Sequence, residues 1–238
     1  MKKYCFTITS LLVLVMGITS CSNEENKTQT QMVARPTVPI LDRTVTDVDG
    51  NIYKIVTIGN QKWTKTNLNV SHYRNGDPIP QVTDPTQWVN LTTGAWCYYN
   101  NDPANGPIYG KLYNWYAVND PRGLAPTGCH VPSDAEWTAL TTILGGELVA
   151  GNKMKATAGW TPFLGITNTN SSGFTGLPGL YRTTSGSFND IVSRGYWWSS
   201  SEDNPSGAWF RYLHYNEGFA TRASYYKLLG LSVRCLKD

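Results

Sequence analysis

Histidines, serines and carboxylates are the side chains in this chain that most often take part in catalysis. Their spacing matches no catalytic motif. The three histidines, His72, His130 and His214, lie far apart, and none has the spacing of a zinc ligand set. The chain contains no Gly-x-Ser-x-Gly nucleophile elbow. Residues 199–202 place hydroxyls beside a carboxylate, which we interpret as a turn. We therefore expect no catalytic residue, no metal and no cofactor.

Residues 47–51, with the sequence Asp-Val-Asp-Gly-Asn, have the acidic spacing that begins many calcium loops. The remaining ligands of an EF-hand, including its distal glutamate, are missing. Strand-like residues lie on both sides of this segment. We therefore predict a hairpin turn here and no cation site.

Cys21 is the cysteine with the clearest expected chemistry. The chain begins Met1-Lys2-Lys3 and continues with a mostly apolar run over residues 6–17. That run is too short to cross a bilayer but suits a signal peptide. The sequence Ile-Thr-Ser directly before Cys21 resembles a bacterial lipobox, whose small residues admit the peptidase and whose thiol receives the lipid. An ordinary secretion signal is the alternative.

This interpretation divides the N-terminal region into a lipoprotein signal peptide over residues 1–20 and a flexible tether over residues 21–43. The acidic stretch Ser22-Asn23-Glu24-Glu25-Asn26 resembles the surface-export signal of Bacteroidota lipoproteins. Lipid chains on Cys21 would hold the protein without a transmembrane helix. We expect an outer-membrane, lipid-anchored protein exposed at the cell surface.

The composition favours a strand-rich and loop-rich domain, with 9 Trp, 14 Tyr, 22 Gly and only 16% charged residues. Trp197, Trp198 and Trp209 are the candidate ligand-binding aromatics, because flat rings bind sugar faces and peptide surfaces well. Side chains alternate along strands, so the core is the competing interpretation of each ring. The polar loops over residues 159–176 and 201–208 are long enough to line a site.

One helix has clear start and stop signals, and the other elements must be arranged around it. Ser133 and Glu136 have capping-box spacing, and Gly145 suits the end of a helix from Ser133 to Leu144. His130 precedes this helix, and we interpret it as structural. Residues 110–118 predict a second helix.

Strands and turns account for most of the remaining sequence. An N-terminal group of three strands is followed by short strands in the C-terminal half, and no linker divides residues 44–238. The expected strands cover residues 44–47, 52–58, 61–64, 179–182, 188–191, 195–200, 209–215, 220–226 and 231–236.

Several separated blocks together resemble the Fibrobacter succinogenes major paralogous domain. They are Asp49-Gly50-Asn51-x-Tyr53, Ile58-Gly59-x-Gln61-x-Trp63, Tyr109-Gly110-x-Leu112-Tyr113-Asn114-Trp115-Tyr116, Val131-Pro132-Ser133-Asp134-Ala135-Glu136-Trp137, Gly195-Tyr196-Trp197-Trp198-Ser199-Ser200 and Ser232-Val233-Arg234-Cys235. The resemblance covers nearly all of residues 44–238. It implies no activity, because the family has none established.

Two of these blocks are also similar to formylglycine-generating-enzyme domains, at residues 131–137 and 230–235. This likeness implies an α+β, C-type-lectin-like fold with two main helices, a twisted antiparallel sheet and long loops. It does not imply their oxidase activity, because the close cysteine pair that binds copper there is absent here. The calcium-binding strings of lectins are absent as well.

Three cysteines, Cys97, Cys129 and Cys235, follow the expected lipidation site. An exported domain oxidises neighbouring thiols, and an odd number leaves one unpaired. We favour a Cys129–Cys235 disulfide, which would join the start of the helix to the last strand. A Cys97–Cys235 bridge with Cys129 free is the alternative.

These observations favour a non-enzymatic, surface-exposed lipoprotein that binds a glycan or a protein, with the membrane as a partner through its lipid. An enzyme acting on a cell-surface polymer and a purely structural envelope component are the alternatives. The formal net charge of +3 comes with no basic stripe, so we expect no nucleic-acid partner.

Overall fold

The computed structural model describes residues 43–179, 181–189 and 192–238. All of them belong to one compact unit, Pro39–Asp238. The expected signal peptide, Cys21 and all but the last residue of the expected tether lie outside the described residues. In the described part of the chain, no helix is long and apolar enough to cross a membrane.

A five-stranded antiparallel sheet joins the two ends of the described chain. Its order is β1-β2-β3-β12-β6, with β1 Thr44–Thr46, β2 Ile52–Ile58, β3 Gln61–Thr64, β12 Leu236–Lys237 and β6 Cys129–His130. The expected first three strands are confirmed. Asp47 shapes the turn between β1 and β2, because its carboxylate accepts the N–H groups of Asp49 (3.0 Å) and Asn51 (2.9 Å). The same carboxylate accepts a hydrogen bond from the Tyr53 hydroxyl. Both carboxylate oxygens of Asp47 are therefore engaged in hydrogen bonds around the turn.

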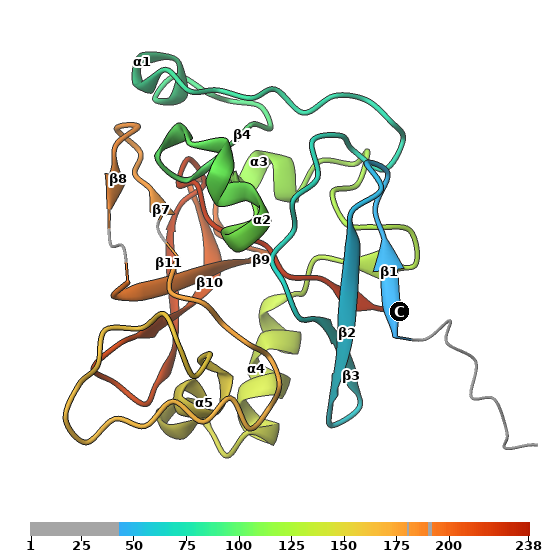
Figure 1. Cartoon of the computed structure of the whole chain (residues 1–238). Helices are drawn as coiled ribbons and strands as arrows, with labels where there is room; N and C mark the ends of the chain where they lie inside the picture. Colours follow the sequence, from blue (N-terminus) through green and yellow to red (C-terminus); the bar gives the residue numbers. More distant parts are fainter. Residues whose placement is uncertain (1–42, 180, 190–191) are drawn as a thin grey trace, which may run out of the picture. The chain divides into compact units, whose positions relative to one another are not determined.

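A second sheet of three long strands forms the centre of the C-terminal half. Its order is β11-β10-β9, with β9 Arg194–Asn204, β10 Gly207–His214 and β11 Ala220–Tyr226. Two helices, α4 (Asp134–Ile143) and α5 (Glu147–Met154), lie below it in Figure 1. The hairpin of β2 and β3 stands beside α4 in the same view.

The capping box of α4 is confirmed. The Glu136 N–H donates to the Ser133 hydroxyl (3.3 Å), and the Glu136 carboxylate accepts the Ser133 N–H (2.7 Å). Trp137 is fully buried on the inner side of α4, with its ring centroid 4.6 Å from that of Trp63 on β3. The helix thereby joins the two sheets through aromatic packing.

The helix expected over residues 110–118 is wrong. Leu112–Tyr113 forms β5, and only Trp115–Val118 forms a helical turn, α3. Tyr113 exchanges backbone hydrogen bonds with Leu231 (2.9 and 3.0 Å), which requires an extended chain. The Asn114 side chain then accepts the Ala117 N–H and starts α3. The second main helix is instead α5.

Short elements complete a mixed helix-and-sheet fold, as expected from the sequence. Two strands of the C-terminal half are shorter than predicted in their described residues, because irregular backbone takes the place of residue 179 in one and of residues 233–235 in the other. The short elements are α1 Pro85–Trp88, β4 Trp96–Cys97, 3₁₀ turns at Tyr99–Asn101 and Pro103–Asn105, α2 Gly106–Tyr109, β7 Tyr181–Arg182 and β8 Phe188–Asn189.

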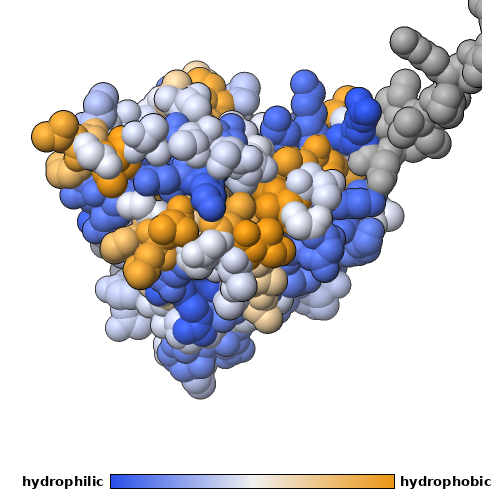
Figure 2. All heavy atoms as spheres, turned by 90° about the horizontal axis from the view of Figure 1, so that it is seen from below, coloured by the Kyte–Doolittle hydropathy of each residue, from blue (hydrophilic) through white to orange (hydrophobic). Residues whose placement is uncertain are grey.

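Some apolar side chains stay exposed on the side of the molecule that carries α4 and α5. Figure 2 shows a band of hydrophobic residues across that face. Leu148 on α5 is 68% exposed, and Leu164 in the loop after α5 is 97% exposed.

A buried arginine, Arg234, holds the C-terminal segment to the rest of the fold. Its guanidinium donates to Asn67 Oδ1 (2.6 Å) and to the carbonyl oxygens of Thr64 (2.7 Å), Phe174 (2.9 Å) and Thr175 (3.0 Å). It also stacks 4.5 Å from the ring centroid of Phe174. Burial lowers the pKa of Arg234 to about 9, so the group is charged at neutral pH.

Replacing Arg234 with Met should lower the free energy of unfolding by about 3 kcal/mol, because several buried acceptors lose their donor. Urea unfolding at neutral pH measures the loss. Lys54→Met, on the exposed face of β2, is the matched control and should change stability by less than about 0.5 kcal/mol. Equal stability of the two variants would contradict the role given to Arg234.

The expected Cys129–Cys235 disulfide is absent, because all three described cysteines are free and buried. The register of β6 and β12 places Lys237, not Cys235, opposite Cys129. Cys235 is therefore a diagonal neighbour, typically about 7–8 Å away, and disulfides seldom exceed about 6.8 Å between Cα atoms. Cys97 lies in a separate apolar cluster with Trp88 and Leu112, so the alternative bridge is absent as well.

The three thiols should resist alkylation by iodoacetamide at pH 8 in the folded protein. Burial raises the pKa of Cys97 to about 12 and that of Cys129 to about 11, and it raises the pKa of Cys235 further. Denaturation in urea without reductant should then release three reactive groups, counted by mass spectrometry. Finding only one such group would reveal a disulfide and contradict this arrangement.

Candidate functional site

The three-stranded sheet separates its side chains onto two faces with different roles. Trp198 pairs with Phe210, and Tyr196 pairs with Tyr212, so these rings share one face, here called the aromatic face. The intervening residues, including Trp197 and Arg211, point to the opposite face. That face packs against α4 and α5 and is here called the helix face.

Two of the expected ligand-binding aromatics are core residues. Trp197 and Trp198 are fully buried, at 1% and 0% exposure. The indole N–H of Trp197 donates to Asn67 Oδ1, and that of Trp198 donates to the carbonyl of Tyr113, each at 2.9 Å. The prediction that they contact a ligand is wrong, because both rings and both donors are used inside the fold.

Trp209 remains partly exposed but lies under a cation. The guanidinium of Arg222 on β11 sits 3.3 Å from its ring centroid. This stacking covers one side of the ring, so Trp209 lies at the rim of the helix face and outside any described hollow.

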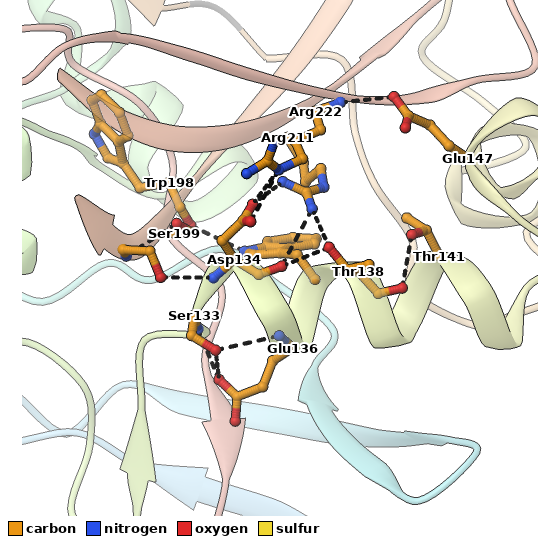
Figure 3. Close-up of polar contacts among 12 residues, drawn as sticks. Ser133, Asp134, Glu136, Thr138, Thr141, Glu147, Trp198, Ser199, Arg211 and Arg222 are labelled. Atoms are coloured by element: carbon orange, nitrogen blue, oxygen red, sulfur yellow. Dashed lines mark hydrogen bonds and ion pairs between the residues drawn. The ribbon is translucent and has the colours of Figure 1, made fainter. Parts of the chain in front are cut away.

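A polar network on the helix face fastens α4 to the sheet (Figure 3). The Asp134 carboxylate accepts hydrogen bonds from Arg211 (2.6 Å) and Arg222 (3.0 Å). Arg211 is buried and also donates to the Thr138 hydroxyl (2.9 Å), while the Arg222 N–H donates to Glu147 (3.0 Å). Because the hydrogen-bond donors and acceptors of these residues pair within the network, we interpret the network as structural.

A hollow opens on the aromatic face, beside the apolar core. We call it the aromatic groove. It has a volume of about 270 Å³ and is lined by Tyr181, Thr183, Thr184, Tyr196, Phe210, Tyr225 and Leu229. The rings of Tyr181 and Tyr196 lie 4.9 Å apart and those of Tyr196 and Phe210 lie 6.1 Å apart, which holds them as one packed wall.

A second hollow of about 390 Å³ adjoins the groove through Thr184. Its lining comprises Tyr116, Thr184, Pro205, Ser206, Tyr226, Lys227 and Leu228. The rings of Tyr225 and Tyr226 lie 4.8 Å apart, and one belongs to each hollow. The two hollows therefore offer neighbouring aromatic walls along the end of β11.

The lining of both hollows is close to neutral. None of the lining residues is acidic. The one lysine, Lys227, donates to Glu202 (2.8 Å) and to the carbonyl of Pro205 (2.9 Å), which balances its charge. Threonine, serine and tyrosine hydroxyls supply the polar atoms. This surface suits an uncharged ligand with apolar faces and hydroxyl edges.

A different cluster, around His130, has the residue types of a catalytic site but another arrangement. It lies in a hollow of about 330 Å³ with Ser133, Glu136 and Ser200. His130 Nε2 lies 2.9 Å from Glu136 Oε1, and its Nδ1 contacts Asp238. Burial acts to lower the pKa of His130, but the hydrogen bonds to both carboxylates outweigh it and raise that pKa above its usual value.

A histidine held between two carboxylates favours its protonated form and makes a poor general base. The Ser133 hydroxyl donates to Glu136 and caps α4, so it is not an activated nucleophile. The cluster joins the start of α4 to the chain's last residue, which supports the structural interpretation of His130. Among the residues that the structure describes, no group of three or more His, Cys, Asp or Glu side chains could hold a metal ion.

Stability should depend on pH through this cluster. The raised pKa of His130 gives stabilisation that is complete below about pH 6.5 and is lost as pH rises through the folded-state pKa. Burial acts to raise the pKa of Glu136, but bonds from Ser133 and His130 outweigh it and lower that pKa. Its contribution is complete above about pH 4.5 and is lost as pH falls further.

Melting temperatures measured from pH 4 to 9 check this dependence. His130→Gln should flatten the decline above pH 6.5. His214→Gln is the control, because the ring of His214 contacts the Asn216 side-chain amide instead of a carboxylate. An unchanged decline in His130→Gln would contradict the assignment.

The sequence drew attention to Trp197, Trp198 and Trp209, whereas the aromatic groove is lined by other rings, some of them on the same strands. Tyr181 and Tyr196 were not singled out, and their role depends on the register of β9 with β10 and on the position of β7. The alternation Tyr196, Trp197, Trp198 does place neighbouring rings on opposite faces. Which face is open follows only from the packing of α4 and α5.

The chain was compared with the models of known protein families. Residues 56–237 match the model of the Fibrobacter succinogenes major domain. Comparisons with curated proteins and with solved structures gave no match.

Proposed function

The chain belongs to the Fibrobacter succinogenes major domain family, and we propose that it is a non-enzymatic receptor for a neutral glycan, held at the outer membrane by a lipid on Cys21. The aromatic groove is the proposed binding site. Its scaffold is proposed to be a variant of the C-type-lectin-like fold, with its ligand at the end of the β9–β11 sheet.

The arrangement of rings in the groove carries this proposal. A pyranose ring has apolar C–H faces and a hydroxyl edge, so it stacks on tyrosine rings and exchanges hydrogen bonds with nearby hydroxyls. Tyr196 and Tyr225 come from separate strands and Tyr181 from the β7–β8 hairpin, yet all three line one hollow. The second hollow, at about 390 Å³, lies within the range of about 300–1,000 Å³ that is typical of small-ligand sites, and the groove, at about 270 Å³, lies just below it.

Binding without cleavage fits the lining of the groove. Glycoside hydrolysis commonly uses two carboxylates on either side of the scissile bond. None of the residues that line the two hollows carries a carboxylate. The proposed role is therefore recognition of the sugar surface.

The localisation rests on the N-terminal sequence. A charged start, an apolar run and small residues before Cys21 support export followed by lipidation. The acidic residues after Cys21 support transfer to the cell surface. In this arrangement the domain meets glycans outside the cell while the lipid keeps it on the membrane.

A glycan array of neutral polysaccharides, followed by calorimetry of the best ligand, tests the proposal. Tyr196→Ala and Tyr225→Ala should each weaken binding about tenfold, equivalent to about 1.4 kcal/mol. Tyr109→Ala is the control, since Tyr109 is a partly exposed tyrosine outside both hollows. Selective binding of peptides, or no glycan binding at millimolar concentration, would overturn the proposal.

A further inference from the structure

Six exposed apolar side chains come from α4, α5, the loop after α5 and the turn before β11, and we call them the basal apolar surface. Its outermost member is Leu164, which is 97% exposed. The six are Ile143, Leu148, Val149, Phe163, Leu164 and Phe219.

These residues come from separate elements that the fold brings together. Leu148 and Val149 lie on α5, and Ile143 at the end of α4 packs over Gly59 in the β2–β3 turn. The turn between β10 and β11 approaches α5, where the Asn152 N–H donates to Gly218 O (3.3 Å). Phe163 packs against Tyr215 in that turn, with ring centroids 5.7 Å apart.

Core packing gives no reason for the two leucines, Leu148 and Leu164, which are 68% and 97% exposed. On α5 the core is filled by Ala150, Gly151 and Met154, while Leu148 and Val149 point outward. None of the six residues lines any of the hollows described above. The surface is therefore suited to a deformable apolar partner and not to a small molecule. Large exposed apolar patches mark protein or membrane contacts.

We propose that the basal apolar surface docks into the headgroup and acyl boundary of the same membrane that holds the chain's lipid anchor. This inference rests on the proposed lipidation of Cys21. The chain from Cys21 to residue 42 spans at most about 75 Å when extended. As a flexible chain, its root-mean-square span is about 25 Å.

The tether makes the membrane the favoured occupant over a second copy or another protein. A folded domain of this size has a radius of gyration of about 16 Å, so the surface stays within reach of the bilayer. Such tethering gives even a weak apolar contact a high effective concentration. In Figure 1 β1 starts at its lower end, toward the level of α4 and α5.

Docking in this way would orient the aromatic groove away from the membrane. Phe219 precedes β11, and Tyr225 lies near its far end. Six residues of strand at about 3.4 Å each separate them by about 20 Å. The groove also lies on the aromatic face of the sheet, whereas α5 packs on the opposite helix face, so both surfaces can be used together.

The test uses the full chain with Cys21→Ser, which carries no lipid, so that only the surface acts. Leu164→Cys is labelled with a nitrobenzoxadiazole dye in a chain that also carries Cys5→Ser, since the remaining native thiols, Cys97, Cys129 and Cys235, are buried. With vesicles of phosphatidylethanolamine and phosphatidylglycerol, the emission should shift to the blue, and doxyl lipids should quench it. The same dye at exposed Asn75→Cys is the control and should show neither effect.

A second pair of variants, Leu148→Asp and Leu164→Asp, should weaken vesicle binding at least tenfold and leave glycan affinity unchanged. Unchanged dye emission, or equal vesicle binding by the Asp variants, would overturn the inference. Dimerisation that these variants abolish, without vesicle binding, would also overturn it in favour of a second copy. Glycan binding tests the groove, and the mass of protein extracted from membranes tests the lipidation of Cys21. Failure of either proposal can therefore be told apart from failure of membrane docking.

Discussion

The buried guanidinium of Arg234 is the interaction on which the rest of the structure depends. It binds backbone carbonyls at the end of β3 and in the loop before residue 176, and it also binds the side chain of Asn67. Asn67 in turn accepts the indole N–H of Trp197 and donates to the carbonyl of Tyr109 (2.8 Å). One cation near the C-terminus thereby links the segments at residues 64–67, 109, 174–175 and 197.

Buried cations also bind backbone carbonyls in two other irregular segments. Arg182 is fully buried and donates to the carbonyls of Gly186 (3.0 Å) and Thr83 (2.8 Å), stacked on Trp88. Lys155 donates to the carbonyls of His214 (3.0 Å) and Glu217 (2.6 Å). A loop lacks a strand partner for its carbonyls, so a buried cation with several donors supplies the missing hydrogen bonds. Long loops can therefore be held in fixed positions with little regular structure.

Tryptophans support the loops in a similar way while they fill the core. The indole N–H of Trp115 donates to Ser199 O (2.9 Å), and that of Trp160 donates to Gly176 O (3.0 Å). The large aromatic content of the chain therefore serves mainly as structural packing. Tyr196 and Tyr225 differ from these rings, because both line the aromatic groove.

The sequence by itself determined the elements that depend on near neighbours. The capping box at Ser133 and Glu136, the turn at Asp47 and the strand at residues 52–58 follow from local hydrogen bonds and alternation, and each is present. The expected helix over residues 110–118 failed, because pairing of Tyr113 with Leu231, far along the chain, overrides a local helical pattern. Only the tertiary structure decided which aromatic rings are buried and that Cys129 faces Lys237, because burial and strand register arise from contacts between distant segments.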